Sequence, residues 1–104
     1  MRFDELKKAL LSVGVPVSHY KAAKQTDKYI VWAEDGQADS LWTDNKMCRQ
    51  TIQGTVDYYT KSEYDPNVEA VQAALDSAAS WRLNSVQYED DTGYIHWEWV
   101  WEVA

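Results

Sequence analysis

Two segments of the chain carry apolar residues at alternating steps of three and four, the spacing of one face of an α-helix. The first covers residues 2–13 and ends before Gly14, a residue suited to the position just after a helix. The second follows Asp65, a good N-cap, and has Pro66 in its first turn. The apolar positions are Phe3, Leu6, Leu10 and Val13 in the first segment and Val68, Val71, Leu75 and Ala78 in the second. We therefore predict two amphipathic helices.

Four further segments are rich in β-branched and aromatic residues, as strands are, and the second and fourth alternate cleanly between two faces. The predicted strands cover residues 29–34, 48–60, 81–89 and 94–103. The sequence DDTG at 90–93 is a turn, so the last two strands form a β-hairpin. Residues 15–28 are predicted to be a loop or an irregular edge segment, and the turn-rich residues 35–47 a long loop.

The resulting order of elements is α-β-β-α-β-β, with no linker or repeat to divide it. A length of 104 residues suits a single domain spanning 1–104. The predicted fold class is α+β, a four-stranded, mainly antiparallel sheet with two helices packed on one face. Gly54, inside the second predicted strand, indicates a bulge or a close approach of another group to the backbone.

The closing strand, YIHWEWVWEV at 94–103, places three of the six tryptophans at alternate positions. Trp97, Trp99 and Trp101 therefore share one face of the strand. The favoured interpretation is that this face is core beneath the helices. Because three indoles bury a large area, the second interpretation is a subunit interface that covers what two short helices leave bare. A base-stacking platform is disfavoured, because Glu98 and Glu102 lie on the same strand.

Charge and cysteine content exclude several classes of function. The net charge of −7 divides into +1 for residues 1–52 and −8 for residues 53–104, so the basic patch needed to bind nucleic acid is missing. The acidic half is expected to be a solvated surface. A single cysteine, Cys48, excludes an intrachain disulfide and a cysteine-rich zinc site. No apolar run is long enough for a signal peptide or a membrane span, so we expect a cytoplasmic protein.

Few residues suggest catalysis or metal binding. His19 and His96 are far apart in the sequence, and His96 is interpreted as a strand-surface histidine rather than a ligand. Cys48 is expected to pack as a small apolar residue, and the EDD triplet at 89–91 is interpreted as part of a hairpin turn rather than a cation site. No phosphate loop, nucleophile elbow or zinc-helix motif is present. We expect no enzymatic activity, no cofactor and no bound metal.

Two stretches carry a resemblance to a known family. They are DNKMCRQTIQGTVDYYTKSEYDPNVEAVQAAL at 44–75 and SVQYEDDTGYIHWEWVWEV at 85–103. The first resembles a pattern of Asp-Asn-Lys, a strand ending Tyr-Thr-Lys, an acidic-Pro turn and a helix carrying Val-Glu. The second resembles a closing hairpin with an acidic tip and an aromatic strand. On these motifs the chain is similar to tail terminator, or tail-completion, minor tail proteins of phages and prophages of Gram-positive bacteria.

The resemblance implies a structural role without catalysis or cofactor. Such proteins form a ring, usually a hexamer, that caps the tail tube and offers a surface for the head-completion protein. The implied location is the host bacterial cytoplasm during assembly and then the virion tail. Residues 35–47 would form an arm that reaches a neighbouring subunit or the tube. The residues expected at a subunit or partner interface are Leu41, Trp42, Asn45, Lys46, Trp97, Trp99 and Trp101.

Two alternatives stay open from the sequence. The first is a cytoplasmic adaptor or inhibitor that binds a basic protein partner through the acidic half of the chain. The second, less favoured, is a small enzyme whose site is assembled between subunits.

Overall fold

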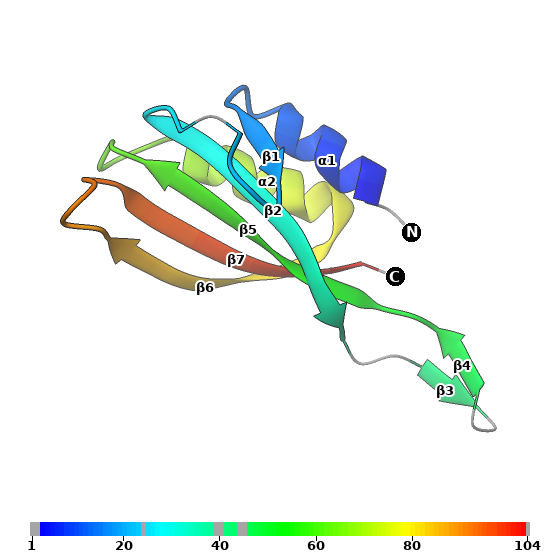
Figure 1. The fold of residues 1–104 in the computed structure, drawn as a ribbon. Helices are drawn as coiled ribbons and strands as arrows, with labels where there is room; N and C mark the ends of the chain where they lie inside the picture. Colours follow the sequence, from blue (N-terminus) through cyan, green and yellow to red (C-terminus); the bar gives the residue numbers. More distant parts are fainter. Residues whose placement is uncertain (1–2, 24, 39–40, 44–45, 104) are drawn as a thin grey trace.

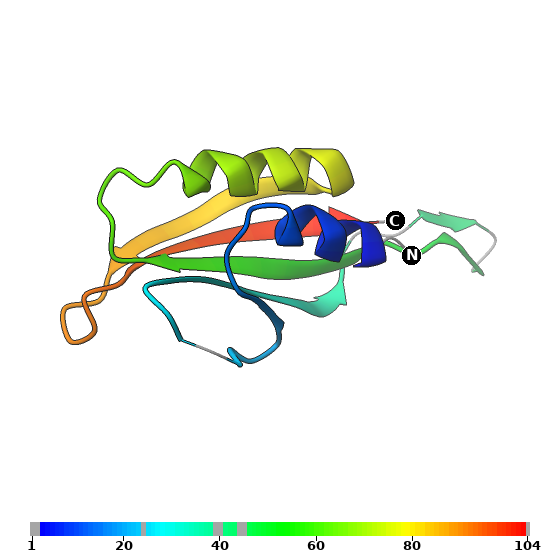
Figure 2. The same cartoon turned by 90° about the horizontal axis from the view of Figure 1, so that it is seen from above.

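The computed structural model describes residues 3–23, 25–38, 41–43 and 46–103, with side chains described outside residues 39–49. Two helices lie next to each other on one face of a twisted sheet, as Figures 1 and 2 show from two directions. The elements are α1 (Phe3–Leu11), β1 (Val17–His19), β2 (Lys28–Gln37), β3 (Leu41–Thr43), β4 (Lys46–Arg49), β5 (Ile52–Thr60), α2 (Asn67–Ala78), β6 (Ser80–Tyr88) and β7 (Ile95–Val103).

The main sheet has five strands in the order β1-β2-β5-β7-β6, and it is mixed. Strand β1 runs parallel to β2, whereas every other neighbouring pair is antiparallel. The predicted four-stranded, mainly antiparallel sheet and its α-β-β-α-β-β order are therefore wrong. The strand that was missed lies within residues 15–28, and its three residues are too few for an alternating pattern to be recognised. The hydrogen bonding to β2 begins just before β1, where the Ile30 N–H donates to the Pro16 carbonyl at 2.8 Å.

The second difference is an arm, which we define as β3, β4 and the chain that joins them to β2 and β5. The β2–β5 hairpin stays paired as far as Gln37 and Ile52, beyond which β3 and β4 form a separate antiparallel ribbon. Figure 1 shows this ribbon projecting from the end of the sheet, away from both helices. The arm contributes to the elongated shape of the molecule, with extents of 51 × 25 × 23 Å. The long loop predicted for residues 35–47 is thus largely an extension of the hairpin.

The core lies between the helices and the face of the sheet that they cover. Cross-strand partners share a face, so the pairing of Val56 with Trp99 and of Gly54 with Trp101 puts these residues on the helix side. The buried cluster comprises Leu6, Leu10, Ile30, Trp32, Val56, Tyr58, Val71, Ala74, Leu75, Ala78, Trp99, Trp101 and Val103. Both predicted helical stripes therefore contribute to it, which confirms their periodicity.

Gly54 allows the indole of Trp101 to lie directly against the backbone of β5. A Cβ at this position would lie 2.4 Å from the Trp101 ring and 2.0 Å from the Ala33 carbonyl oxygen. The pairing of β2 with β5 also shifts register between Glu34 and Gly36 at this level. Of the two alternatives predicted for Gly54, the close approach is confirmed, whereas the irregularity in pairing lies in the neighbouring strand β2.

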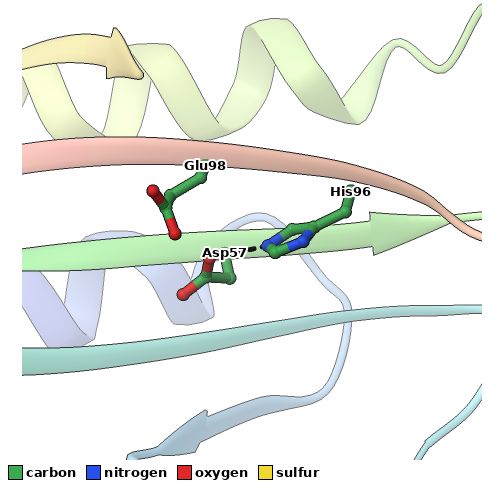
Figure 3. Close-up of side chains that lie close together, drawn as sticks. All are labelled: Asp57, His96 and Glu98. Atoms are coloured by element: carbon green, nitrogen blue, oxygen red, sulfur yellow. Dashed lines mark hydrogen bonds and ion pairs between the residues drawn. The ribbon is translucent and has the colours of Figure 1, made fainter. Parts of the chain in front are cut away.

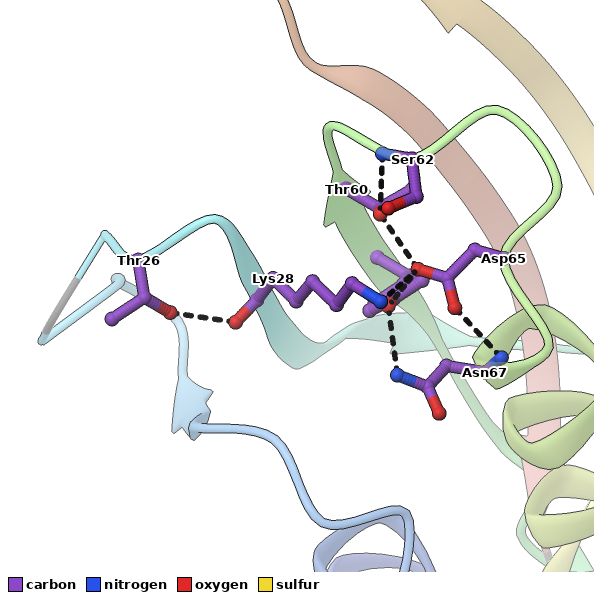
Figure 4. Close-up of polar contacts among 7 residues, drawn as sticks. Thr26, Lys28, Thr60, Ser62, Asp65 and Asn67 are labelled. Atoms are coloured by element: carbon purple, nitrogen blue, oxygen red, sulfur yellow. Dashed lines mark hydrogen bonds and ion pairs between the residues drawn. The ribbon is translucent and has the colours of Figure 1, made fainter.

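Asp65 joins the start of α2 to the ends of β5 and β2 (Figure 4). Its Oδ1 accepts the Asn67 N–H at 2.9 Å, the bond expected of the predicted N-cap. Its Oδ2 accepts the hydroxyls of Tyr58 and Thr60, each at 2.6 Å, and lies 3.4 Å from the Lys28 Nζ. Burial alone would raise the pKa of Asp65, but these hydrogen bonds and the Lys28 charge outweigh it and lower that pKa below its ordinary value.

Candidate functional site

The seven residues predicted to meet a partner have different environments. Trp99 and Trp101 are completely buried within the chain, so these two are core and are removed from the predicted interface. The Trp99 Nε1–H donates to the Gln72 Oε1 at 3.2 Å. Trp97 is only partly buried and packs at the edge of the core. Leu41, Trp42 and Lys46 lie in the arm, and Asn45 lies outside the described residues.

A strip of apolar side chains lies on the helix side of β6 and β7, and the helices leave it partly or largely exposed. Its members pair with residues of β7 that face the helices: Leu83 with Trp99, Val86 with Trp97, and Tyr88 with Ile95. Among the described residues, helix α2 makes a polar contact with this strand only near the strand's start, where the Trp81 indole donates to Asp76. We define the apolar strip as Leu83, Val86, Tyr88, Ile95 and Trp97.

The exposure of the strip is large for apolar side chains. Leu83 is 42%, Val86 46% and Tyr88 65% exposed, and the neighbouring Tyr64 is 92% exposed. Two hollows adjoin the strip, one bordered by Val86, Tyr88 and Ile95 and the other by Tyr64, Val68 and Trp97. Clustered exposed apolar groups of this kind mark interaction surfaces more often than isolated ones do.

The arm and the apolar strip lie toward opposite ends of the sheet. Figure 1 shows the arm at one end of the sheet and the β6–β7 turn at the opposite end, and the strip runs along β6 toward that turn. Strand β6 is also the last strand of the sheet, with nine residues, whereas β1 at the other edge has three. An edge strand of this length presents unpaired backbone groups that another chain can use.

A polar cluster occupies the opposite face of the sheet (Figure 3). The His96 Nε2 lies 2.7 Å from the Asp57 Oδ1, and ligand atoms of Asp57, His96 and Glu98 all lie within 4.8 Å of one another. The imidazole stacks on the Tyr59 ring, with centroids 4.3 Å apart. The hydrogen bond and charge of Asp57, together with Glu89 and Glu98, raise the pKa of His96 despite partial burial. Burial and the Asp57 charge likewise raise the pKa of Tyr59 to about 12.

The sequence singled out His96 but not Asp57. The interpretation of His96 as a surface histidine considered only neighbours on its own strand, whereas its partner lies across the sheet. The pairing of Asp57 with Glu98 and of Tyr59 with His96 brings these groups together. Because the strands 48–60 and 94–103 were both predicted, an explicit register between them was the one signal that would have revealed the cluster.

Of the remaining sequence-derived candidates, His19 and the EDD triplet make contacts within the fold. His19 stacks on Trp32 at 4.0 Å and pairs with the Glu34 carboxylate at 2.7 Å. The EDD triplet opens the predicted hairpin turn, in which the Gly93 N–H donates to the Glu89 carbonyl and Gly93 has a φ of 78°. The side chain of Cys48 lies outside the described side chains.

Of the two described helices, neither combines the length and apolar character needed to cross a membrane. No protein-family model matches the chain, and no curated protein matches it.

Proposed function

We propose that this protein is a phage tail structural protein of the terminator or completion type, which assembles into a ring that caps the tail tube and joins it to the head. The support for this family is the resemblance of residues 44–75 and 85–103 to tail terminator proteins. The arm is the observation that carries the assembly part of the proposal.

The arm has the properties of a segment that is completed by a neighbour. A two-stranded ribbon on its own is only marginally stable in water and needs a further strand or an apolar surface against it. The sequence of the ribbon includes Leu41, Trp42 and Met47, three large apolar residues in a segment that projects from the body. Burial of a large apolar side chain at an interface contributes about 1.5–3 kcal/mol.

The apolar strip is the surface that suits the arm of the next subunit. The arm and the strip are two different surfaces, which lie toward opposite ends of the sheet. A contact between the arm of one subunit and the strip of the next is therefore head-to-tail. Head-to-tail contacts produce a closed ring when the rotation between subunits closes, and a filament when it does not. A ring of this kind matches the assembly implied by the resemblance.

The test is to shorten the arm without disturbing the body. The Ala38 N–H donates to the Thr51 carbonyl at 2.9 Å, so these residues are adjacent across the hairpin. Replacing residues 39–50 with Asn-Gly, which favours a two-residue hairpin turn, closes β2 onto β5. We expect the shortened chain to melt as one cooperative unit and to remain monomeric.

The full chain should form a discrete oligomer, alone at high concentration or when mixed with tail tube protein. Sedimentation velocity gives the masses of both chains under identical conditions. Equal assembly of the two chains would refute a role for the arm. A full chain that stays monomeric at all concentrations and does not bind tail tube protein would refute the proposed function.

A further inference from the structure

We propose that Asp57, His96 and Glu98 form a binding site for a divalent transition-metal ion, and that Zn²⁺ is the ion that fits it best. The three ligand atoms lie within 4.8 Å of one another on the sheet face that the helices do not cover (Figure 3). This site is separate from the arm and from the apolar strip, and it goes beyond the proposed structural function.

The sheet holds the three ligands in fixed positions. Asp57 on β5 is directly opposite Glu98 on β7, and His96 is two residues before Glu98, so all three side chains leave the same face. Both strands are interior strands of the sheet, each hydrogen-bonded on two sides. The side chains of Asp57 and His96 are 16% and 17% exposed, so water competes weakly for them while an ion still has access.

Neighbouring groups orient each ligand in a way that suits metal binding. The Glu89 Oε2 lies 3.7 Å from the His96 Nδ1, and its charge favours a proton on Nδ1. The ion would then replace the proton that the His96 Nε2 donates to Asp57 in the metal-free chain. The Tyr59 ring stacks on the imidazole at an interplanar angle of 17° and restricts its rotation. The Asn84 Nδ2 donates to the Glu98 Oε1 at 2.7 Å, which fixes that carboxylate while leaving its other oxygen available.

The donor set selects the class of ion. One imidazole and two carboxylates match Zn²⁺ and similar transition metals, whereas Ca²⁺ and Mg²⁺ prefer sites made entirely of oxygen. Zinc bonds of about 2.0–2.2 Å place tetrahedral ligand atoms about 3.4 Å apart. On binding an ion, the 2.7 Å distance between Asp57 and His96 would therefore increase slightly, and the longest distance between ligand atoms would decrease. A dication would also offset the repulsion between two carboxylates on adjacent strands.

The experiment measures Zn²⁺ binding to the full chain by isothermal titration calorimetry after treatment with a chelator. We expect one saturable site per chain. Co²⁺ titration provides an independent readout, because a visible absorption band reports coordination by protein ligands. Asp57→Asn, His96→Gln and Glu98→Gln should each weaken Zn²⁺ affinity by at least about tenfold. Glu89→Gln removes the negative charge beside the His96 Nδ1 and should weaken it by about tenfold.

Two control variants test whether other possible metal ligands in the chain bind the ion instead. His19→Gln removes the other histidine, which also pairs with a single carboxylate, and Cys48→Ser removes the only thiol. Both should bind Zn²⁺ as the unmodified chain does, and circular dichroism confirms that all variants are folded. The proposal is overturned by an absence of saturable binding, by unchanged affinity in the folded triad variants, or by loss of binding in either control.

Discussion

Three tryptophans on one strand have three different environments. Trp99 is buried with its indole N–H hydrogen-bonded to Gln72, and Trp97 stays partly exposed at the margin of the core. Trp101 is buried against Gly54, and its Nε1 has no hydrogen-bond acceptor among the described residues. The alternation of the strand therefore specifies which face carries the indoles, while the reach of the helices decides how far each indole is buried.

Trp99→Ala should lower the free energy of unfolding by about 3–5 kcal/mol, because it empties a fully buried indole site. Urea denaturation followed by circular dichroism measures this change. Trp97→Ala is the matched control and should cost clearly less, since part of that indole already contacts solvent. A loss of less than about 1 kcal/mol in Trp99→Ala would show that this indole is not core.

Gly54→Ala should destabilise the protein by about 3 kcal/mol, because the added methyl group meets the Ala33 carbonyl and the Trp101 ring. Gly36→Ala is the control, since a Cβ there meets nothing within 4 Å. Thermal melts of both variants make the comparison. Equal melting temperatures for the two variants would contradict the close packing of Trp101 on β5.

Asp65 should make the free energy of unfolding depend on pH under acidic conditions. Its pKa is lower in the folded state than the value of about 3.9 in the unfolded chain. Its contribution is therefore fully present above the unfolded pKa and is lost as the pH falls through the folded pKa. Asp65→Asn should lower the free energy of unfolding at pH 7 by about 2 kcal/mol.

Denaturation at several pH values between 2 and 7 gives the comparison (roughly the range over which a carboxyl group titrates). The difference between the unmodified chain and Asp65→Asn should shrink below about pH 4. Asp27→Asn is the control, because that carboxylate is 85% exposed and 3.9 Å from Lys61. A difference for Asp65→Asn that does not change with pH would contradict the role of the ionised carboxylate.

At the scale of elements, long periodic segments were predictable and short or cross-strand features were not. Both helices and the strands near 81–89 and 94–103 follow from their own sequences, because apolar spacing records which face each element buries. Strand β1 has only three residues and exists as a strand because it pairs with β2. The sequence of residues 17–19 alone does not indicate this pairing. Residues 35–47 were predicted to be a loop because Asp, Gly, Ser and Asn are frequent among them, and these residues are common in turns.

The polar cluster on the sheet face that the helices do not cover is a second feature that depends on contacts between strands. His96 and Glu98 are visible as neighbours on one strand, but Asp57 is 39 residues from His96 and joins them only through the β5–β7 register. Predicting the two strands without aligning them therefore left the cluster hidden.

The apolar strip makes a prediction that concerns β6 as an element. Val86→Glu places a charge in the strip, and because Val86 is 46% exposed the change should leave folding intact while reducing assembly at least about tenfold. Leu11→Glu is the matched control, since Leu11 on α1 is 50% exposed and lies outside the strip. Light scattering on both variants gives the oligomer population. Equal assembly by the two variants would exclude the strip as an interface.

At the scale of the whole molecule, the fold separates three surfaces of different chemistry. The helices cover one face of the sheet and bury most of the tryptophan row, while the uncovered face holds the Asp57–His96–Glu98 cluster. The arm projects from one end of this body, and the apolar strip lies along β6 and β7 toward the opposite end. The proposed ring needs two different contacts on each chain, and the arm and the apolar strip are the surfaces that we propose for them.

The most direct test of this account is a cross-link between the arm and the strip of neighbouring subunits. Trp42→Cys and Tyr88→Cys are introduced together into a Cys48→Ser chain, and disulfide formation is followed by mass spectrometry and non-reducing electrophoresis under assembling conditions. We predict a disulfide between residue 42 of one chain and residue 88 of the next, giving a ladder that ends at the size of the closed ring. Assembly without this cross-link, or a cross-link formed only within single chains, would contradict head-to-tail contact through the arm.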